Sequence, residues 1–193
     1  MKLSYVIIQG QQKEVAERSA ATLRWIDATY NRAMTKGNIA MVILTQADMW
    51  DVDEAATGTA HLSGYKQYLD KIAEGTKAYG MPVLMVMGDS HTYRSDNPLQ
   101  KGAPCAIEVE SGKPAVSCSD SRAEALTAAR KSPAEAYMAQ NHGYNVPNFH
   151  RIVVHGETMP LEWLKLHIDP TASAKHDLEA FGPFSWKRVQ PAM

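Results

Sequence analysis

Two short apolar stretches, each followed at once by a polar segment, constrain the fold of this chain more than any other feature. Residues 39–44 and 83–87 are entirely apolar, which is typical of strands that are buried on both faces of a sheet. Between them, residues 61–79 carry mostly apolar side chains in steps of three and four, which predicts an amphipathic helix. A helix that joins two buried strands predicts a right-handed crossover between parallel neighbours.

The residues before the first of these strands continue the alternation of strand and helix. Residues 4–9 predict a strand that ends at Gly10, and residues 12–34 predict a helix, because their apolar positions share one helical face. The order strand, helix, strand, helix, strand predicts an α/β fold with a mixed, mainly parallel sheet and helices on both faces. We expect a single domain over residues 1–193, a length that supports one core and is marginal for two.

The remainder of the chain has a different composition. Residues 97–148 are rich in Gly, Pro, Ser and Ala, which predicts a loop-rich insertion over or beside the site, with one helix near 121–139. Residues 151–155 and 161–168 predict two strands that a turn joins into an antiparallel hairpin. The aromatic tail after residue 180 is expected to pack across an edge of the sheet.

Charge and hydropathy argue against two classes of partner. The net charge is -1 and the Lys and Arg residues do not cluster, so nothing indicates a nucleic-acid-binding surface. No apolar run reaches the roughly 20 residues that cross a bilayer, and the run at residues 3–8 is too short for a signal peptide. The expected partner is a small molecule, and the oligomeric state is not indicated.

The only two cysteines, Cys105 and Cys118, lie in the segment 97–148, which is rich in Gly, Pro and Ser. Unpaired cysteines usually occupy apolar interiors, so we expect the two to form a disulfide, which requires Cα atoms within about 7 Å. Such a bond would favour a compartment outside the cytoplasm. Two reduced thiols in a cytosolic protein are the alternative.

Polar side chains follow both buried strands at their carboxyl ends. Gln46 and Asp48 follow the first, and the loop 88–91, with the sequence GDSH, follows the second. Ligands bind beyond the carboxyl ends of parallel strands, so we expect Gln46 and Asp89 to lie close together. Asp89 and His91 are suitable ligands for a divalent metal that activates water. The alternative is that Asp89 caps backbone amides and His91 only hydrogen-bonds within the loop.

The Gly-Asp-Ser of the same loop also resembles the nucleophile block of the GDSL esterases, with Ser90 as the nucleophile. That chemistry requires a histidine base. The D-x-x-H and G-x-N-D motifs that complete the site in these esterases are absent from the sequence, so this interpretation is the least favoured.

Four segments, which follow one another in the expected order, carry a better resemblance that covers most of the chain. They are QADMW at 46–50, GDSHTYRSDNPL at 88–99, NFHRIVVHG at 148–156 and residues 161–170. Together they resemble the C-terminal half of a bacterial subgroup of the calcineurin-like metallophosphoesterases. The resemblance implies part of an αββα sandwich and the hydrolysis of a small phosphoester by water bound to Mn, Zn or Fe.

The resemblance also implies roles for individual residues. Asp89 and His91 would be catalytic residues and metal ligands, and Arg94 and Tyr93 would bind the substrate. For Arg94 the alternative is an ion pair with Asp96 or Asp89. Asp89 stands where the family has the first His of a G-H-x-H loop. Gln46 and Asp48 would be further metal ligands. They follow the preceding strand, at about the place where the family has a ligand His.

The early motifs of the family, D-x-H, G-D and G-N-H, do not occur in the expected places. The chain therefore resembles a metallophosphoesterase domain without its N-terminal half, and we expect one bound ion rather than two, with weak or no activity. The alternative is a non-catalytic remnant or binding domain with an incomplete metal site.

Overall fold

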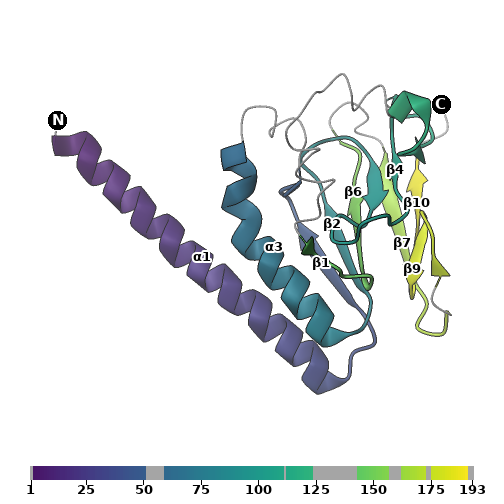
Figure 1. The fold of residues 1–193 in the computed structure, drawn as a ribbon, viewed down its shortest axis with the longest axis horizontal. Coiled ribbons are helices and arrows are strands. Elements are labelled where there is room, and N and C mark those ends of the chain that lie inside the picture. Colours follow the sequence, from purple (N-terminus) through teal and green to yellow (C-terminus); the bar gives the residue numbers. More distant parts are fainter. Residues whose placement is uncertain are drawn as a thin grey trace.

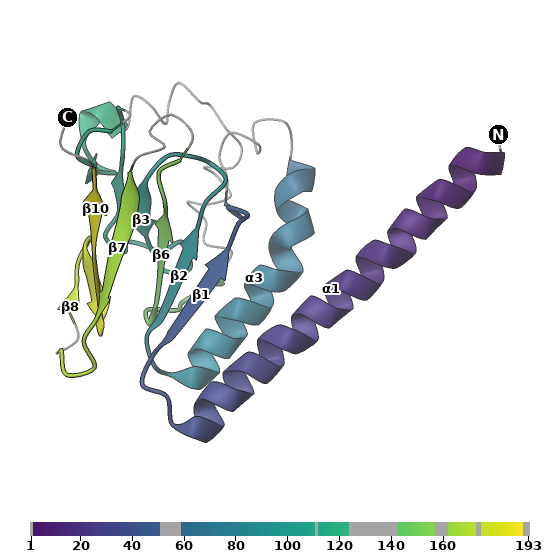
Figure 2. The same cartoon turned by 180° about the vertical axis from the view of Figure 1, so that it is seen from behind.

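A helical layer and two sheets make up the fold of the computed structural model (Figure 1). Two long helices, α1 (Lys2–Lys36) and α3 (Thr59–Tyr79), lie side by side on one face of the larger sheet. The smaller sheet covers the opposite face, as the view from behind also shows (Figure 2). The structure describes these residues: 2–50, 59–110, 112–123, 143–156, 162–172 and 175–190.

The larger sheet has six strands in the order β1-β2-β6-β3-β4-β5. Its first half is parallel and consists of β1 (Met41–Thr45), β2 (Val83–Met87) and β6 (Phe149–Val153). Its second half is antiparallel and consists of short strands: β3 (Arg94–Asp96), β4 (Ala106–Ile107) and β5 (Val116–Ser117). The predicted α/β class and mixed sheet are confirmed, and β2 has the predicted bounds.

Alternate residues of the parallel strands build two separate cores, because successive side chains of a strand point to opposite faces. Val83, Met85 and Met87 of β2 pack with the helices, where Tyr30 of α1 and Ile72 of α3 contribute to the same cluster. The intervening residues face the smaller sheet, and that second core contains Leu84, Tyr93, Ile152, Phe181, Phe184 and Trp186.

The smaller sheet overturns the expectation of helices on both faces. It has four strands in the order β7-β10-β9-β8. Their bounds are β7 (Trp163–Ile168), β10 (Phe184–Val189), β9 (Ala180–Gly182) and β8 (Lys175–His176). The aromatic tail therefore forms strands that cover a face of the larger sheet, where we expected a segment across an edge.

The hairpin predicted for residues 151–155 and 161–168 is wrong, because the two strands belong to different sheets. Every residue of β6 is buried, as befits a central strand. Leu164 and Leu166 of β7 are half-buried between exposed neighbours, as befits a strand with one solvated face. The partner of β7 is β10.

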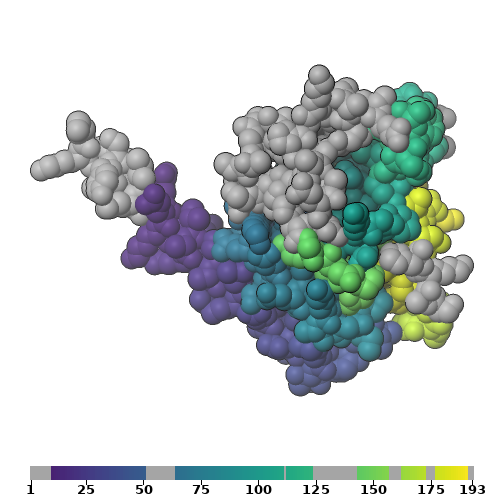
Figure 3. Space-filling view, viewed as in Figure 1, coloured from purple at the N-terminus to yellow at the C-terminus, as the bar shows by residue number. Residues whose placement is uncertain are grey.

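The strand predicted for residues 4–9 is also wrong, because these residues form the first turns of α1. Gly10 does not end the helix: a glycine inside a helix costs only about 1 kcal/mol, and Gln, Lys and Glu follow it. The predicted helix over 12–34 is the remainder of α1. In the space-filling view the purple part of α1, which begins near residue 10, extends away from the body of the molecule (Figure 3).

The insertion predicted for residues 97–148 contributes the rim of the larger sheet, through β4 and β5. Most of the helix predicted near 121–139 lies outside the described residues. No helix in the described part of the chain is long and apolar enough to cross a membrane.

The predicted disulfide is confirmed in the same rim. Cys105 and Cys118 are bonded, with a Cα–Cα distance of 5.4 Å. The bond lies beside the pairing of β4 with β5, where the backbone N–H of Cys118 donates to the carbonyl of Cys105 at 3.0 Å.

Candidate functional site

The carboxyl ends of β1 and β2 meet at one edge of the larger sheet. The two strands pair in parallel with Thr45 opposite Met87, so the residues that follow them are neighbours. Gln46 Nε2 donates to Asp89 Oδ1 at 2.8 Å, and the backbone N–H of Gly88 donates to the Gln46 carbonyl at 3.2 Å. The predicted proximity of Gln46 and Asp89 is confirmed.

The loop 88–91 has an unusual backbone. Asp89 and His91 both adopt left-handed conformations, with φ of 76° and 57°. For residues other than glycine this region costs roughly 1–2 kcal/mol each, and such strain concentrates at functional sites. Gly156, just after β6, leaves room for His91, since a Cβ at this position would lie 3.0 Å from His91 Cδ2. The loop is thus held between the ends of β1 and β6.

Asp48 is buried, and hydrogen bonds engage both of its carboxylate oxygens. Oδ1 accepts from the backbone N–H of Trp50 at 3.0 Å and from Arg151 Nη1 at 2.9 Å. Oδ2 accepts from Ser90 Oγ at 2.9 Å. Asp48 therefore fixes the loop 88–91 to the interior through Ser90.

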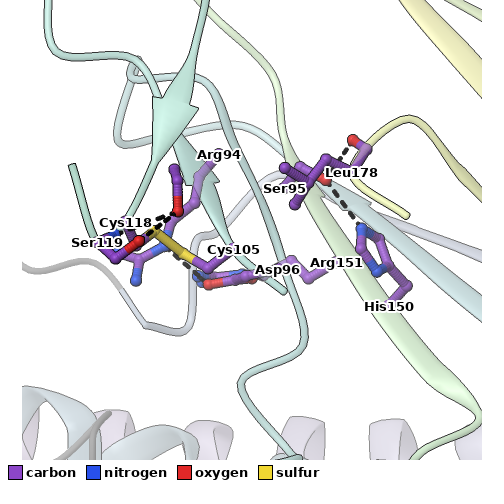
Figure 4. Close-up of a disulfide and its surroundings, with 10 residues drawn as sticks. Arg94, Ser95, Asp96, Cys105, Cys118, Ser119, His150, Arg151 and Leu178 are labelled. Atoms are coloured by element: carbon purple, nitrogen blue, oxygen red, sulfur yellow. Dashed lines mark hydrogen bonds and ion pairs between the residues drawn. A yellow bond between two sulfur atoms is a disulfide. The ribbon is translucent and has the colours of Figure 1, made fainter. Parts of the chain in front are cut away.

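Arg151 continues this network toward the antiparallel strands. Its side chain is fully buried, and Nε and Nη2 donate to the two oxygens of Asp96 at 2.8 and 2.7 Å. Arg94 Nε donates to Asp96 Oδ2 at 2.7 Å (Figure 4). The guanidinium of Arg151 also lies 5.1 Å from the centroid of the Trp50 ring. The result is a row of alternating charges, two carboxylates and two guanidinium groups, which is buried except at Arg94.

The charges of this row stabilise one another. Burial alone would raise the pKa of Asp96, but Arg151 and Arg94 outweigh it and lower the pKa from 3.8 to about 2. Burial alone would lower the pKa of Arg151, but Asp96 and Asp48 outweigh it and raise the pKa. Both groups are therefore charged across the physiological range.

The two residues expected to bind substrate have different positions. Arg94 lies at the half-buried end of the row and donates to Asp96 through Nε. Its guanidinium has five N–H donors in all, so the others are left for a further partner. Tyr93 lies between the two sheets, where its hydroxyl accepts from Trp186 Nε1 at 3.0 Å and Arg188 stacks 4.7 Å from its ring centroid. Its side chain is in the second core, so the structure does not bring it together with Asp89 and His91.

The expected metal ligands do not form a closed site. Asp89 and His91 share a loop and Gln46 contacts Asp89, but Asp48 is committed to Arg151 and Ser90. Within the described ranges, no group of three or more His, Cys, Asp or Glu side chains is arranged to hold a metal ion. The described residues therefore do not fit a two-metal centre.

A second buried polar cluster was not predicted from the sequence. Glu108 Oε2 lies 2.6 Å from His155 Nδ1, and Glu108 Oε1 accepts from Arg188 Nη2 at 2.9 Å. Arg188 also forms two hydrogen bonds to Glu162, at 2.7 and 2.9 Å. The four residues come from distant parts of the chain, and no local motif links them, so only the fold reveals this cluster.

Comparison with protein-family models, with curated proteins and with solved structures finds no match to this chain.

Proposed function

We propose that this chain is a metallophosphoesterase-like domain that binds a small phosphoester at the loop 88–91 but does not complete a catalytic metal centre. The observation that carries the proposal is the position of Asp48. As a metal ligand it would have to surrender its contacts with Arg151 and Ser90. Removing one partner of a buried ion pair costs about 3–5 kcal/mol, so a cation competes poorly for this carboxylate.

Two features support a phosphorylated ligand at this edge. Arg94 keeps guanidinium donors beyond the one that contacts Asp96, and a guanidinium matches the geometry of phosphate oxygens. His91 lies at the end of the strained loop, where an imidazole N–H would donate to a phosphate oxygen. Positioning of the ligand, rather than attack on it, is the role that we assign to these two side chains.

Metal-dependent phosphoester hydrolysis is the second candidate. It is favoured by Asp89 and His91, two potential ligands that share one strained loop at the carboxyl edge of the sheet. A metal bound there would supply activated water, and the remaining ligands would have to come from residues outside the closed network around Asp48.

The esterase interpretation receives no support from the geometry of Ser90. Its hydroxyl donates to Asp48, whose carboxylate is already paired with Arg151. A serine nucleophile requires a basic partner that removes its proton, and a carboxylate stabilised by a guanidinium is a poor one.

The experiment uses the full chain with phenyl phosphate as ligand and p-nitrophenyl phosphate as substrate, with and without Mn²⁺ or Zn²⁺. We expect phenyl phosphate to shift the amide NMR signals of residues 88–94. We expect p-nitrophenyl phosphate to be hydrolysed no faster with the protein than in the same metal-containing buffer without it. The variant His91→Ala should weaken binding. The matched variant His167→Ala, on the exposed face of the smaller sheet, should not.

Each result decides between the candidates. Turnover that disappears in His91→Ala would establish the second candidate and reject the first. An absence of amide shifts together with an absence of turnover would reject both.

The disulfide supports a proposal about location. Disulfides persist in oxidising compartments and are rare in the cytosol, so we infer that the protein acts outside the cytoplasm. Thiol labelling of cell fractions tests this, because a fully reduced pair in the native protein would contradict it.

A further inference from the structure

The strand β7 lies at the end of the smaller sheet. Its six residues pair with β10 alone among the strands that the structure describes. An edge strand presents unpaired backbone N–H and C=O groups and is a template for pairing with another segment. This edge, which no described strand pairs with, is long enough for such pairing, because strands commonly have 5–6 residues, about 17–20 Å.

An apolar surface that no described segment covers lies beside this edge. A groove of about 420 Å³ lies between β7 and the strands β1 and β2 of the larger sheet. Leu164 and Leu166 line it from β7, and Leu44 and Val86 line it from the larger sheet. Leu44 is 75% exposed and Trp163, which also lines the groove, is 56% exposed. A contiguous patch of exposed, large apolar side chains marks an interaction site.

Two lysines lie opposite each other on the outer face of the smaller sheet next to the same edge, where Asp177 and Glu179 line the same hollow. Lys165 of β7 lies directly opposite Lys187 of β10 in the antiparallel register, and both are exposed. Like charges that face each other across a strand pair are unfavourable. An acidic side chain on a strand added to β7 would lie beside Lys165 and relieve this repulsion.

We propose that the free edge of β7 binds an extended segment of a partner protein, with alternating apolar and acidic side chains, as a fifth strand of the smaller sheet. Its apolar side chains would fill the groove over Leu44 and Val86, and its acidic side chains would point outward beside Lys165. Pairing of β7 with a second copy of itself is disfavoured, because it would add the lysine of the copy to an existing pair of lysines. The proposal is independent of the phosphoester site.

The test measures fluorescence anisotropy of labelled, capped peptides with the full chain. The probe alternates Val and Glu over six residues, and its control alternates Val and Lys. We expect saturable binding of the acidic peptide and at least about tenfold weaker binding of the basic one. Hydrogen exchange followed by NMR should show new protection at alternate amides of β7 when the acidic peptide binds.

Two charge-reversal variants make the test specific. Lys165→Glu should weaken binding of the acidic peptide and strengthen binding of the basic one. Lys13→Glu, an equally large charge change on the exposed surface of α1, should leave both affinities unchanged. The proposal is overturned by equal affinity for the two peptides, by an unchanged affinity in Lys165→Glu, by protection outside β7, or by dimerisation of the chain through β7.

Discussion

Arg151 Nη1 lies 2.9 Å from Asp48 Oδ1, although 103 residues separate the two in the sequence. The pair joins the centre of β6 to the segment after β1, and Ser90 extends the connection to the loop 88–91. The exposed edge of the candidate site is therefore held in place by a charge in the interior. Disturbing that charge should affect both the stability of the fold and the geometry of the loop.

The first prediction removes this charge. In Arg151→Met, Asp48 and Asp96 remain buried without their common partner. Breaking a buried ion pair in this way costs about 3–5 kcal/mol, so we expect the free energy of unfolding to fall by that amount in urea denaturation. The amide NMR signals of Ser90 and its neighbours should shift as well.

An exposed ion pair provides the control. Arg122 forms two hydrogen bonds to Asp120 through side-chain nitrogens, at 2.9 and 3.0 Å, and its side chain is 65% exposed. Exposed pairs contribute about 0–1 kcal/mol, so Arg122→Met should leave the midpoint of unfolding almost unchanged. Similar losses in the two variants would show that burial of Arg151 is energetically unimportant.

The second prediction concerns acid. Asp96 has a folded-state pKa of about 2, below its ordinary value of 3.8. A depressed carboxylate pKa stabilises the fold above the unfolded pKa, and that stability is lost as pH falls through the folded pKa. We expect a loss of about 2 kcal/mol between pH 4 and pH 2 from this group. Urea titrations at several pH values measure it.

The variant Asp96→Asn isolates the contribution of that carboxylate. The variant should be less stable at neutral pH, because Arg151 and Arg94 lose their shared anion, and its stability should depend less steeply on pH between 4 and 2. Hydrogen bonds from Arg122 also lower the pKa of Asp120, whose side chain is 30% exposed. Because solvent screens that pair, Asp120→Asn should flatten the pH profile less than Asp96→Asn does. An unchanged slope in Asp96→Asn would contradict the assignment.

The parts of the fold that could be predicted depend on local patterns. The β1 and β2 strands and their connecting helix each show their own apolar pattern, and the crossover rule then brings Gln46 to Asp89. The apolar run at residues 4–9 is ambiguous, because a short apolar run fits a strand or a helix equally well. In the structure it is part of the long α1.

The remaining features depend on contacts between distant residues. The strands β8 and β9 have only two and three residues, too few to show a period, so the second sheet was not predicted. Asp48 and Asp89 look alike as candidate ligands in the sequence. Only the position of Arg151 on β6 shows that Asp48 is a partner in a buried ion pair instead.

The third prediction compares two glycines of α3. A Cβ at Gly75 would overlap the ring of Tyr30, whereas a Cβ at Gly64 would have no heavy atom within 4 Å. Gly64→Ala should stabilise the protein by about 0.5–1 kcal/mol, because alanine favours the helix. Gly75→Ala should destabilise it by about 1–3 kcal/mol through overpacking. Thermal unfolding compares the two. Equal effects would show that α1 and α3 do not pack closely at Tyr30.

The fourth prediction concerns the bond between Cys105 and Cys118, which are 13 residues apart. A disulfide stabilises mainly by restricting the unfolded chain, and a loop of about 15 residues corresponds to about 3 kcal/mol. The bond lies beside the two-residue strands β4 and β5, which have little other pairing, so its loss should also loosen the rim of the larger sheet.

We expect the double variant Cys105→Ser/Cys118→Ser to unfold at lower urea concentration than the oxidised protein and to show faster hydrogen exchange at β4 and β5. Dithiothreitol should reproduce both effects in the wild type and have no effect on the double variant. Equal stability of the oxidised protein and the double variant would mean that the unfolded chain is already restricted in this region without the disulfide.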